Sequence, residues 1–198
     1  AQRAAYRFLL GRLAATEIGR LHQLAPTLGY DDFRVRVPLR ASADFHAFAA
    51  RMAGGVEGVL WPGACGHFVY TAGTVDGRPR MLPATPDLQA HLRAAVSAAW
   101  LLLAARGAGA GIFNGRHVQL GASAALTAAG GVRAGFVDGL VRAGLSDWSR
   151  AYLLGPSDAV AAQPDGPGKT AAVAAEMAGA DVRVLAGPPA ALLEALQA

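Results

Sequence analysis

The residues best suited to chemistry lie in one stretch of the chain, residues 70–85. It follows a short apolar run, residues 67–70, which predicts the end of a buried strand, and a long helical pattern begins at Pro86. Between strand and helix the chain carries residues that suit an anion-binding loop: two glycines, two threonines and an arginine, namely Thr71, Gly73, Thr74, Gly77 and Arg80.

Each of these residue types contributes differently to binding an anion. Glycines let the backbone turn successive N–H groups toward one point, threonine hydroxyls donate further hydrogen bonds, and arginine binds phosphate oxygens through two parallel bonds. The stretch therefore predicts a nucleotide-phosphate site. An ordinary surface turn is the alternative, and Asp76 favours it because a carboxylate repels phosphate.

A second glycine-rich stretch, Gly166-Pro167-Gly168-Lys169-Thr170, resembles the end of a phosphate-binding P-loop. The complete pattern requires a glycine where this chain has Gln163, and no apolar strand leads into it. We expect Lys169 instead to open a helix whose inner face carries Val173 and Met177.

The remaining reactive side chains show no catalytic or metal-binding spacing. The five histidines lack metal-ligand intervals, so no metal site is expected, and the lone cysteine, Cys65, is expected to be buried and structural. Arg93 lies about two turns into the helix that begins at Pro86 and is a weak candidate for a substrate carboxylate, with a solvated arginine as the alternative.

The composition excludes several classes of protein. The 198 residues are 53% hydrophobic and 16% charged with a net charge of +4, and the arginines are scattered singly, which argues against nucleic-acid binding. The most apolar run, residues 94–105, is too short to cross a bilayer, and no signal peptide is visible. High alanine, glycine and arginine content is typical of GC-rich coding, and we expect a bacterial, cytoplasmic protein without a membrane partner.

Apolar periodicity and breaker residues predict alternating helices and strands, hence an α/β fold with helices layered on a mixed β-sheet. No linker divides the chain, so residues 1–198 are predicted to form a single domain. The expected helices cover residues 2–15, 42–52 (capped by Ser42), 86–105, 135–143, 169–178 and 189–197. The expected strands cover residues 67–70, 116–121 and 181–186, and the last of these is expected to be short and buried.

Five segments, in order, resemble one family: the auxin-responsive (plant-type) acyl-acid amido synthetases of the adenylate-forming superfamily. The loop from Thr71 to Thr85 resembles the family's phosphate motif S-S-G-T-T-x-G-x-x-K-x-I-P-x-T. The other four segments are similar to T-x-F-G-x-x-H, Y-x-D-F-R-x-x-V-P, L-W-P-G and a strand followed by a G-x-P turn; they are residues 16–22, 30–38, 60–63 and 181–189.

The resemblance implies that Thr71, Gly73, Thr74, Gly77 and Arg80 line the phosphates of ATP. It further implies Mg-ATP as cofactor, a carboxylic acid that is activated as an acyl-adenylate, and an amine, usually an amino acid, that receives the acyl group. An aromatic or apolar acid would suit a pocket lined by residues such as Trp100, Leu101 and Phe113, although these side chains suit a core equally well.

The chain departs from the family pattern in the loop and in length. Ala72 and Val75 replace hydroxyl residues, and Arg80 replaces lysine. The resemblance covers only the first part of a large N-terminal domain, so we expect an incomplete N-terminal adenylation subdomain, completed by further sequence or by a second chain. A catalytically degraded remnant that acts in binding or assembly is the alternative, and a small α/β nucleotide-binding module is a third hypothesis.

Overall fold

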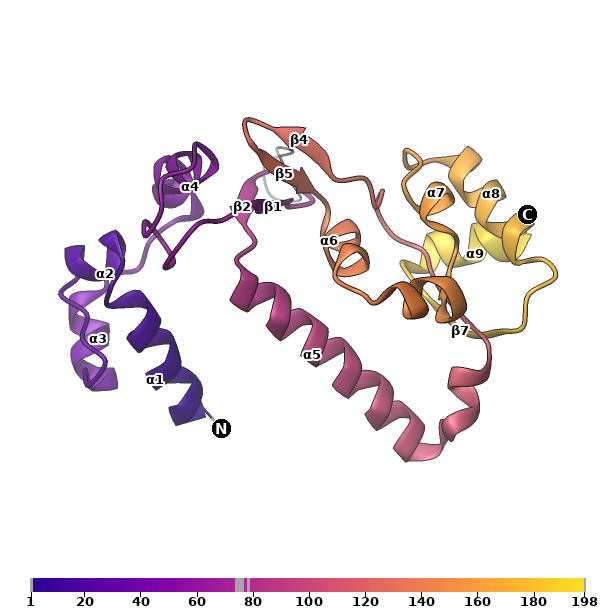
Figure 1. Ribbon diagram of the computed structural model, residues 1–198, viewed down its shortest axis with the longest axis horizontal. Coiled ribbons are helices and arrows are strands. Elements are labelled where there is room, and N and C mark those ends of the chain that lie inside the picture. Colours follow the sequence, from indigo (N-terminus) through magenta and orange to yellow (C-terminus); the bar gives the residue numbers. More distant parts are fainter. Residues whose placement is uncertain (1, 74–76, 78, 198) are drawn as a thin grey trace. The chain divides into compact units, whose positions relative to one another are not determined.

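The computed structural model describes residues 2–73, 77 and 79–197. Contacts between Cα atoms divide the chain into two compact units. Unit 1 consists of Ala1–Thr85 and Ala128–Ala134, and unit 2 consists of Pro86–Thr127 and Gly135–Ala198. Figure 1 colours both units along the sequence.

Unit 1 begins with short helices. They are α1 (Gln2–Leu13), α2 (Glu17–Leu21), α3 (Tyr30–Arg36) and α4 (His46–Ala53), with a 3₁₀ turn at Ser42–Phe45 before α4. The predicted cap at Ser42 is wrong, because the backbone N–H of Ala41 donates to the Asp44 carboxylate at 2.9 Å and the 3₁₀ turn begins there. A carboxylate close to a helix start satisfies an otherwise unpaired N–H group.

The sheet of unit 1 has the strand order β2-β1-β5-β4. Its strands are β1 (His67–Tyr70), β2 (Met81–Pro83), β4 (Thr127–Ala129) and β5 (Val132–Gly135). The predicted strand 67–70 is confirmed as β1, and it pairs with β2 in antiparallel register, Tyr70 opposite Met81. Phe68 of β1 is completely buried in a core that includes Met52 of α4.

Unit 2 alternates helices with strands. Its α-helices are α5 (Pro86–Leu103), α6 (Val137–Ala143), α7 (Asp158–Ala161), α8 (Pro167–Met177) and α9 (Pro189–Gln197). Irregular helical turns follow α5 at Ala104–Ala108 and Ala110–Asn114, and a further π-helical turn lies at Ser149–Leu153. The predicted helices 86–105, 135–143, 169–178 and 189–197 are confirmed with small shifts of their ends.

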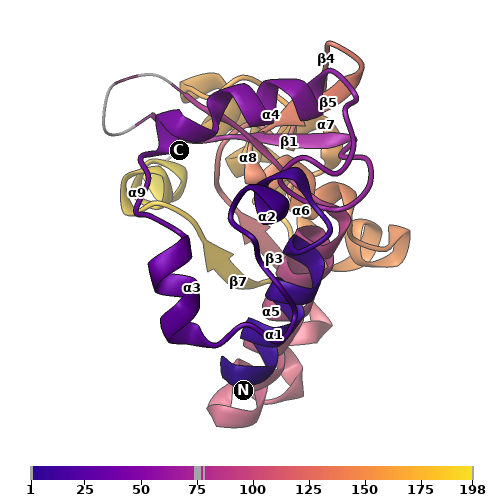
Figure 2. The same ribbon diagram turned by 90° about the vertical axis from the view of Figure 1, so that its left-hand side faces the viewer.

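The sheet of unit 2 is parallel, with the order β6-β3-β7. Its strands are β6 (Leu154–Gly155), β3 (Arg116–Gln119) and β7 (Val182–Ala186). Successive residues of a strand face opposite sides. Val118 therefore packs toward α8 and α9, the helices coloured orange to yellow in Figures 1 and 2. The His117 ring lies 4.6 Å from Trp100 and 6.0 Å from Phe113, between ring centroids.

Two expectations about this unit need correction. The strand predicted at 181–186 is not buried, since Val182 and Leu185 of β7 are 39% and 38% exposed. Leu101 is 64% exposed and does not join Trp100 and Phe113 around His117. The α/β class with helices layered on a mixed sheet is confirmed.

One helix in the described part of the chain is long and apolar enough to span a membrane by length and composition alone. It runs over Pro86–Gly107, 22 residues with a mean hydropathy of 1.3, and is therefore longer than the run on which the sequence argument relied. Core helices of soluble proteins satisfy the same criterion, so the absence of a membrane partner stays a prediction.

Candidate functional site

The loop predicted to bind phosphate connects β1 to β2 and is closed at its base by two hydrogen bonds. The Thr71 N–H donates to the Arg80 carbonyl at 2.9 Å, and the Arg80 N–H donates to the Thr71 hydroxyl oxygen at 2.9 Å. Inside this base, the Gly77 N–H donates to the Gly73 carbonyl at 2.8 Å. The hydrogen bonds between Thr71 and Arg80 thus extend the β1–β2 pairing to the base of the loop.

Both glycines predicted in the loop adopt a left-handed backbone conformation, which glycine allows more readily than other residues. Gly73 has φ 66° and Gly77 has φ 71°, in the left-handed region where side chains with a Cβ are disfavoured. A Cβ at Gly77 would meet no atom within 4 Å, so the backbone conformation, and not lack of space, favours glycine there. Such residues can direct backbone N–H groups toward one side of a loop.

Thr71 plays a double role at the loop base. Its hydroxyl oxygen accepts the Arg80 N–H, and a hydroxyl group that accepts one bond still carries its own proton to donate. Both Thr71 and Arg80 are half-buried. Of the other loop positions, Thr74, Val75 and Asp76 lie outside the described residues.

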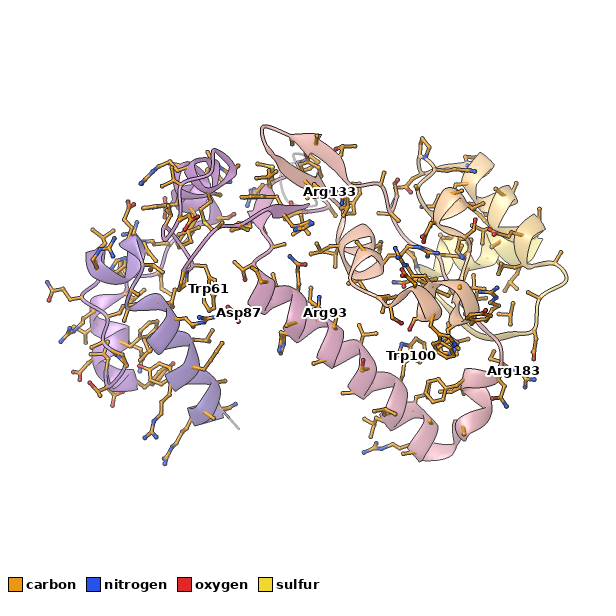
Figure 3. All side chains as sticks on the ribbon, in the orientation of Figure 1. Trp61, Asp87, Arg93, Trp100, Arg133 and Arg183 are labelled. Carbon is orange, nitrogen blue, oxygen red and sulfur yellow. The ribbon has the colours of Figure 1, made fainter. Side chains whose placement is uncertain are left out.

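Arg93, the candidate for a substrate carboxylate, belongs to unit 2 and projects from α5 (Figure 3). Its side chain lies against Gly144, the C-terminal capping residue of α6: a Cβ at Gly144 would be 3.2 Å from Arg93 Nη1. A guanidinium near the end of a helix interacts favourably with the helix dipole. The structure thus gives Arg93 a stabilising contact, and its role in substrate binding stays a prediction.

The first two segments that resemble the family, residues 16–22 and 30–38, are linked by hydrogen bonds around α2 in unit 1, and we call this region the α2 joint. Thr16 caps α2 by accepting the Gly19 N–H at 3.0 Å, and its hydroxyl donates to the Leu13 carbonyl at 2.7 Å. A Cβ at Gly19 would lie 1.8 Å from the same carbonyl oxygen, so no side chain fits there. His22 Nδ1 lies 3.0 Å from the Arg36 carbonyl oxygen, which joins the first segment to the second.

A bidentate ion pair also fixes this joint. Both Glu17 carboxylate oxygens accept from Arg51 of α4, at 2.7 and 2.8 Å. This hydrogen bonding lowers the pKa of Glu17. The pair is half-exposed, so we assign it to the orientation of α2 against α4 rather than to chemistry.

The structure places the other two singled-out residues in structural surroundings. Cys65 is buried, its thiol donates to the His67 carbonyl at 3.2 Å, and burial raises the pKa of the thiol, as a structural cysteine requires. Lys169 opens α8 and is buried, with its ammonium 2.9 Å from the Gly121 carbonyl and 3.0 Å from Asp165. Lys169 therefore links α8 to the end of β3, and Val173 packs inward as predicted.

Sequence reasoning missed a buried cation in unit 2. Arg142 of α6 donates to the Asp158 carboxylate and to the Pro156 carbonyl. Both acceptors lie beyond the reach of helical spacing, so no local pattern marks this contact. In the described part of the chain, no three His, Cys, Asp or Glu side chains gather as a metal site would require.

Comparison with known families identifies the region that contains the loop. A model described as the GH3 family N-terminal domain matches residues 1–146, which include the loop, the α2 joint and the start of unit 2. The segment 181–189 lies outside this match, so its resemblance stays a prediction. No curated protein matches the chain. The match covers most of the sequence, and the chain therefore belongs to the GH3 family, which is acyl-acid amido synthetase-like, without indication of a particular member.

Proposed function

We propose that the chain supplies the ATP phosphate-binding loop of an adenylate-forming ligase. In the proposed reaction, a carboxylic acid attacks the α-phosphate of ATP to give an acyl-adenylate and pyrophosphate, and an amine then takes the acyl group and releases AMP. Residues beyond those seen here, in further sequence or in a second chain, would complete the reaction. We place the activity in the cytoplasm.

The observation that carries this proposal is the closed base of the loop. Mutual hydrogen bonds between Thr71 and Arg80 hold the loop at its ends, and two left-handed glycines lie between them. These four residues occupy matching positions of the family's phosphate motif and lie within residues 1–146. Family membership and loop conformation thus support the same site.

The chemistry expected of this loop is electrostatic. The Thr71 hydroxyl and the loop N–H groups would donate to phosphate oxygens, and Arg80 would offset the charge that develops on the departing pyrophosphate. The hydrogen-bonded base reduces the conformational entropy that the loop loses on binding, which favours such contacts. Magnesium would arrive with ATP and neutralise phosphate charge; we assign it no protein ligand.

ATP–pyrophosphate exchange on the native protein, with a panel of aliphatic and aromatic carboxylic acids, tests the proposal. We expect exchange that depends on one class of acid. Absence of exchange from folded native protein that still binds ATP would favour the degraded remnant, which Ala72 supports because it removes a hydroxyl donor from the motif. Absence of both exchange and ATP binding would overturn the proposed site.

A further inference from the structure

A cleft in unit 2 is lined by none of the residues assigned to the proposed reaction. Its volume is about 490 Å³, within the range of roughly 300–1,000 Å³ that is usual for small-molecule sites. It lies beside β6, the edge strand of the parallel sheet, and includes residues from β3, the turn at 149–153 and α8. Its polar lining contains arginines and carboxylates, and its apolar lining includes Leu154 and Met177.

Most charges in the cleft neutralise one another. Arg150 pairs with Asp147 and lies 3.7 Å from an Asp158 oxygen, while Asp158 also accepts from the buried Arg142. These groups therefore have little remaining charge to offer a ligand. Two other lining residues, Arg116 and Glu176, differ from them.

Arg116 is held firmly but carries an uncompensated charge. Its Nη1 donates to the carbonyls of Ala151 at 2.6 Å and Leu154 at 3.2 Å, which fixes the guanidinium at the cleft wall. Among the described residues, no carboxylate oxygen lies within 4.0 Å of its nitrogens. The carbonyls satisfy only one of its nitrogens and leave other N–H groups to donate.

Glu176 of α8 is the negative counterpart. Both of its carboxylate oxygens accept the Ser157 N–H, at 3.1 and 3.0 Å, which orients the group. Within the described ranges, no lysine, arginine or histidine nitrogen lies within 4.0 Å of it, Arg116 included. The cleft thus presents one fixed cation and one fixed anion that are too far apart to pair.

We propose that this cleft binds a small zwitterion, with its anionic end at Arg116 and its ammonium at Glu176. Because the two charges are separated and Leu154 and Met177 line the same cleft, the ligand that fits has an apolar spacer between its ends, as in an ω-amino carboxylic acid. The inference rests on this cleft alone and does not depend on the proposed ATP site.

The test uses 6-aminohexanoate as probe, with hexanoate and hexylamine as matched ligands that each lack one charged end. Binding to the full chain is followed by calorimetry and by the NMR signal of the Met177 methyl group. We expect saturable binding of the zwitterion, about tenfold tighter than that of either one-charge ligand, as loss of one charge-assisted hydrogen bond predicts. Equal binding of all three ligands, or binding of none, would overturn the proposal.

A pair of variants tests the assignment of the ammonium end. Glu176→Gln keeps an oxygen acceptor for Ser157 but removes the charge, and should weaken 6-aminohexanoate binding about tenfold while hexanoate binding stays unchanged. Glu194→Gln changes an exposed carboxylate on α9 outside the cleft and should alter neither. Unchanged zwitterion binding by Glu176→Gln contradicts the assignment. If that variant does not fold, the three-ligand comparison on the unmodified chain decides.

Discussion

The core of unit 1 is built mainly from apolar side chains, whereas unit 2 also encloses an arginine, a lysine and a histidine. In unit 1, Phe68 and Met52 pack together, and its buried polar side chains are the neutral threonines Thr16 and Thr85. Among the described residues, the buried charged side chains, Arg142 and Lys169, both belong to unit 2. Unit 1 therefore depends more on burial of apolar area, and unit 2 depends in addition on specific hydrogen bonds.

The two units also differ in net charge. Unit 1 carries eleven arginines against six acidic residues, and unit 2 carries seven basic residues against eight acidic ones. The positive charge of the chain therefore belongs to unit 1, which also contains the proposed phosphate loop. A positive field around an anion site raises the rate at which anions reach it, and salt weakens this effect.

The largest expected effect comes from the core of unit 1. Phe68→Ala should lower the free energy of unfolding by about 3–5 kcal/mol, because it removes a fully buried ring and leaves a cavity. Hydrogen exchange resolved by peptide should show lost protection in β1 and retained protection in β3. Equal loss in both strands would show that this core also stabilises unit 2.

The corresponding change in unit 2 removes a cation rather than apolar volume. Arg142→Met should cost about 2–3 kcal/mol, since charged hydrogen bonds to Asp158 and Pro156 are lost while Asp158 keeps access to water. Here β3 should lose exchange protection and β1 should keep it. Arg150→Met is the control, expected to cost less than about 1 kcal/mol because its partner Asp147 is almost fully exposed.

A change in the loop should affect nucleotide chemistry more than stability. Thr71→Val removes a phosphate donor and the acceptor of the Arg80 N–H, so acid-dependent pyrophosphate exchange should fall roughly tenfold or more, about 1.5 kcal/mol. Thr71→Ser keeps the hydroxyl and should retain most of the rate. If Thr71→Val exchanges as fast as the unmodified protein, Thr71 does not contribute to the site.

The smallest expected effect is a pH dependence in unit 1. Burial raises the pKa of Cys65 above the value of about 8.5 that is usual for a thiol, so the unfolded chain loses this proton first as the pH rises. Stability should therefore be complete below about pH 8.5 and decline above it, by an amount that Cys65→Ala abolishes. Identical slopes for both proteins between pH 8 and pH 10.5 would show that the thiol does not contribute.

Much of the fold could be predicted, because long apolar periods report helices and breaker residues report their ends. The helix that begins at Pro86 and the strand at 67–70 are examples. The missed strands are short: β2 has three residues, one of them a proline, and β6 has two. The hairpin between β4 and β5 did carry a signal in the sequence, the dipeptide Gly130-Gly131. Both residues have the positive φ that a tight two-residue turn requires.

The candidate loop could be located from the sequence because Thr71, Gly73, Gly77 and Arg80 lie within ten residues of one another. Binding of ATP phosphates by this loop stays a prediction. The shared cleft of Arg116 and Glu176 could not be predicted, because the parallel sheet and α8 bring together residues that are distant in sequence. The acceptors of Arg142, and the Gly121 carbonyl that accepts from Lys169, escaped prediction for the same reason.

The parallel sheet of unit 2 also has a consequence for synthesis of the chain on the ribosome. Met81 is translated 11 residues after its partner Tyr70, whereas Val182 is translated 66 residues after Arg116. At about 5–20 residues per second, β3 waits roughly 3–13 s for β7. During that interval Val118 and Leu120 lack part of their final cover, and the nascent chain presents an apolar segment that a ribosome-associated chaperone can bind.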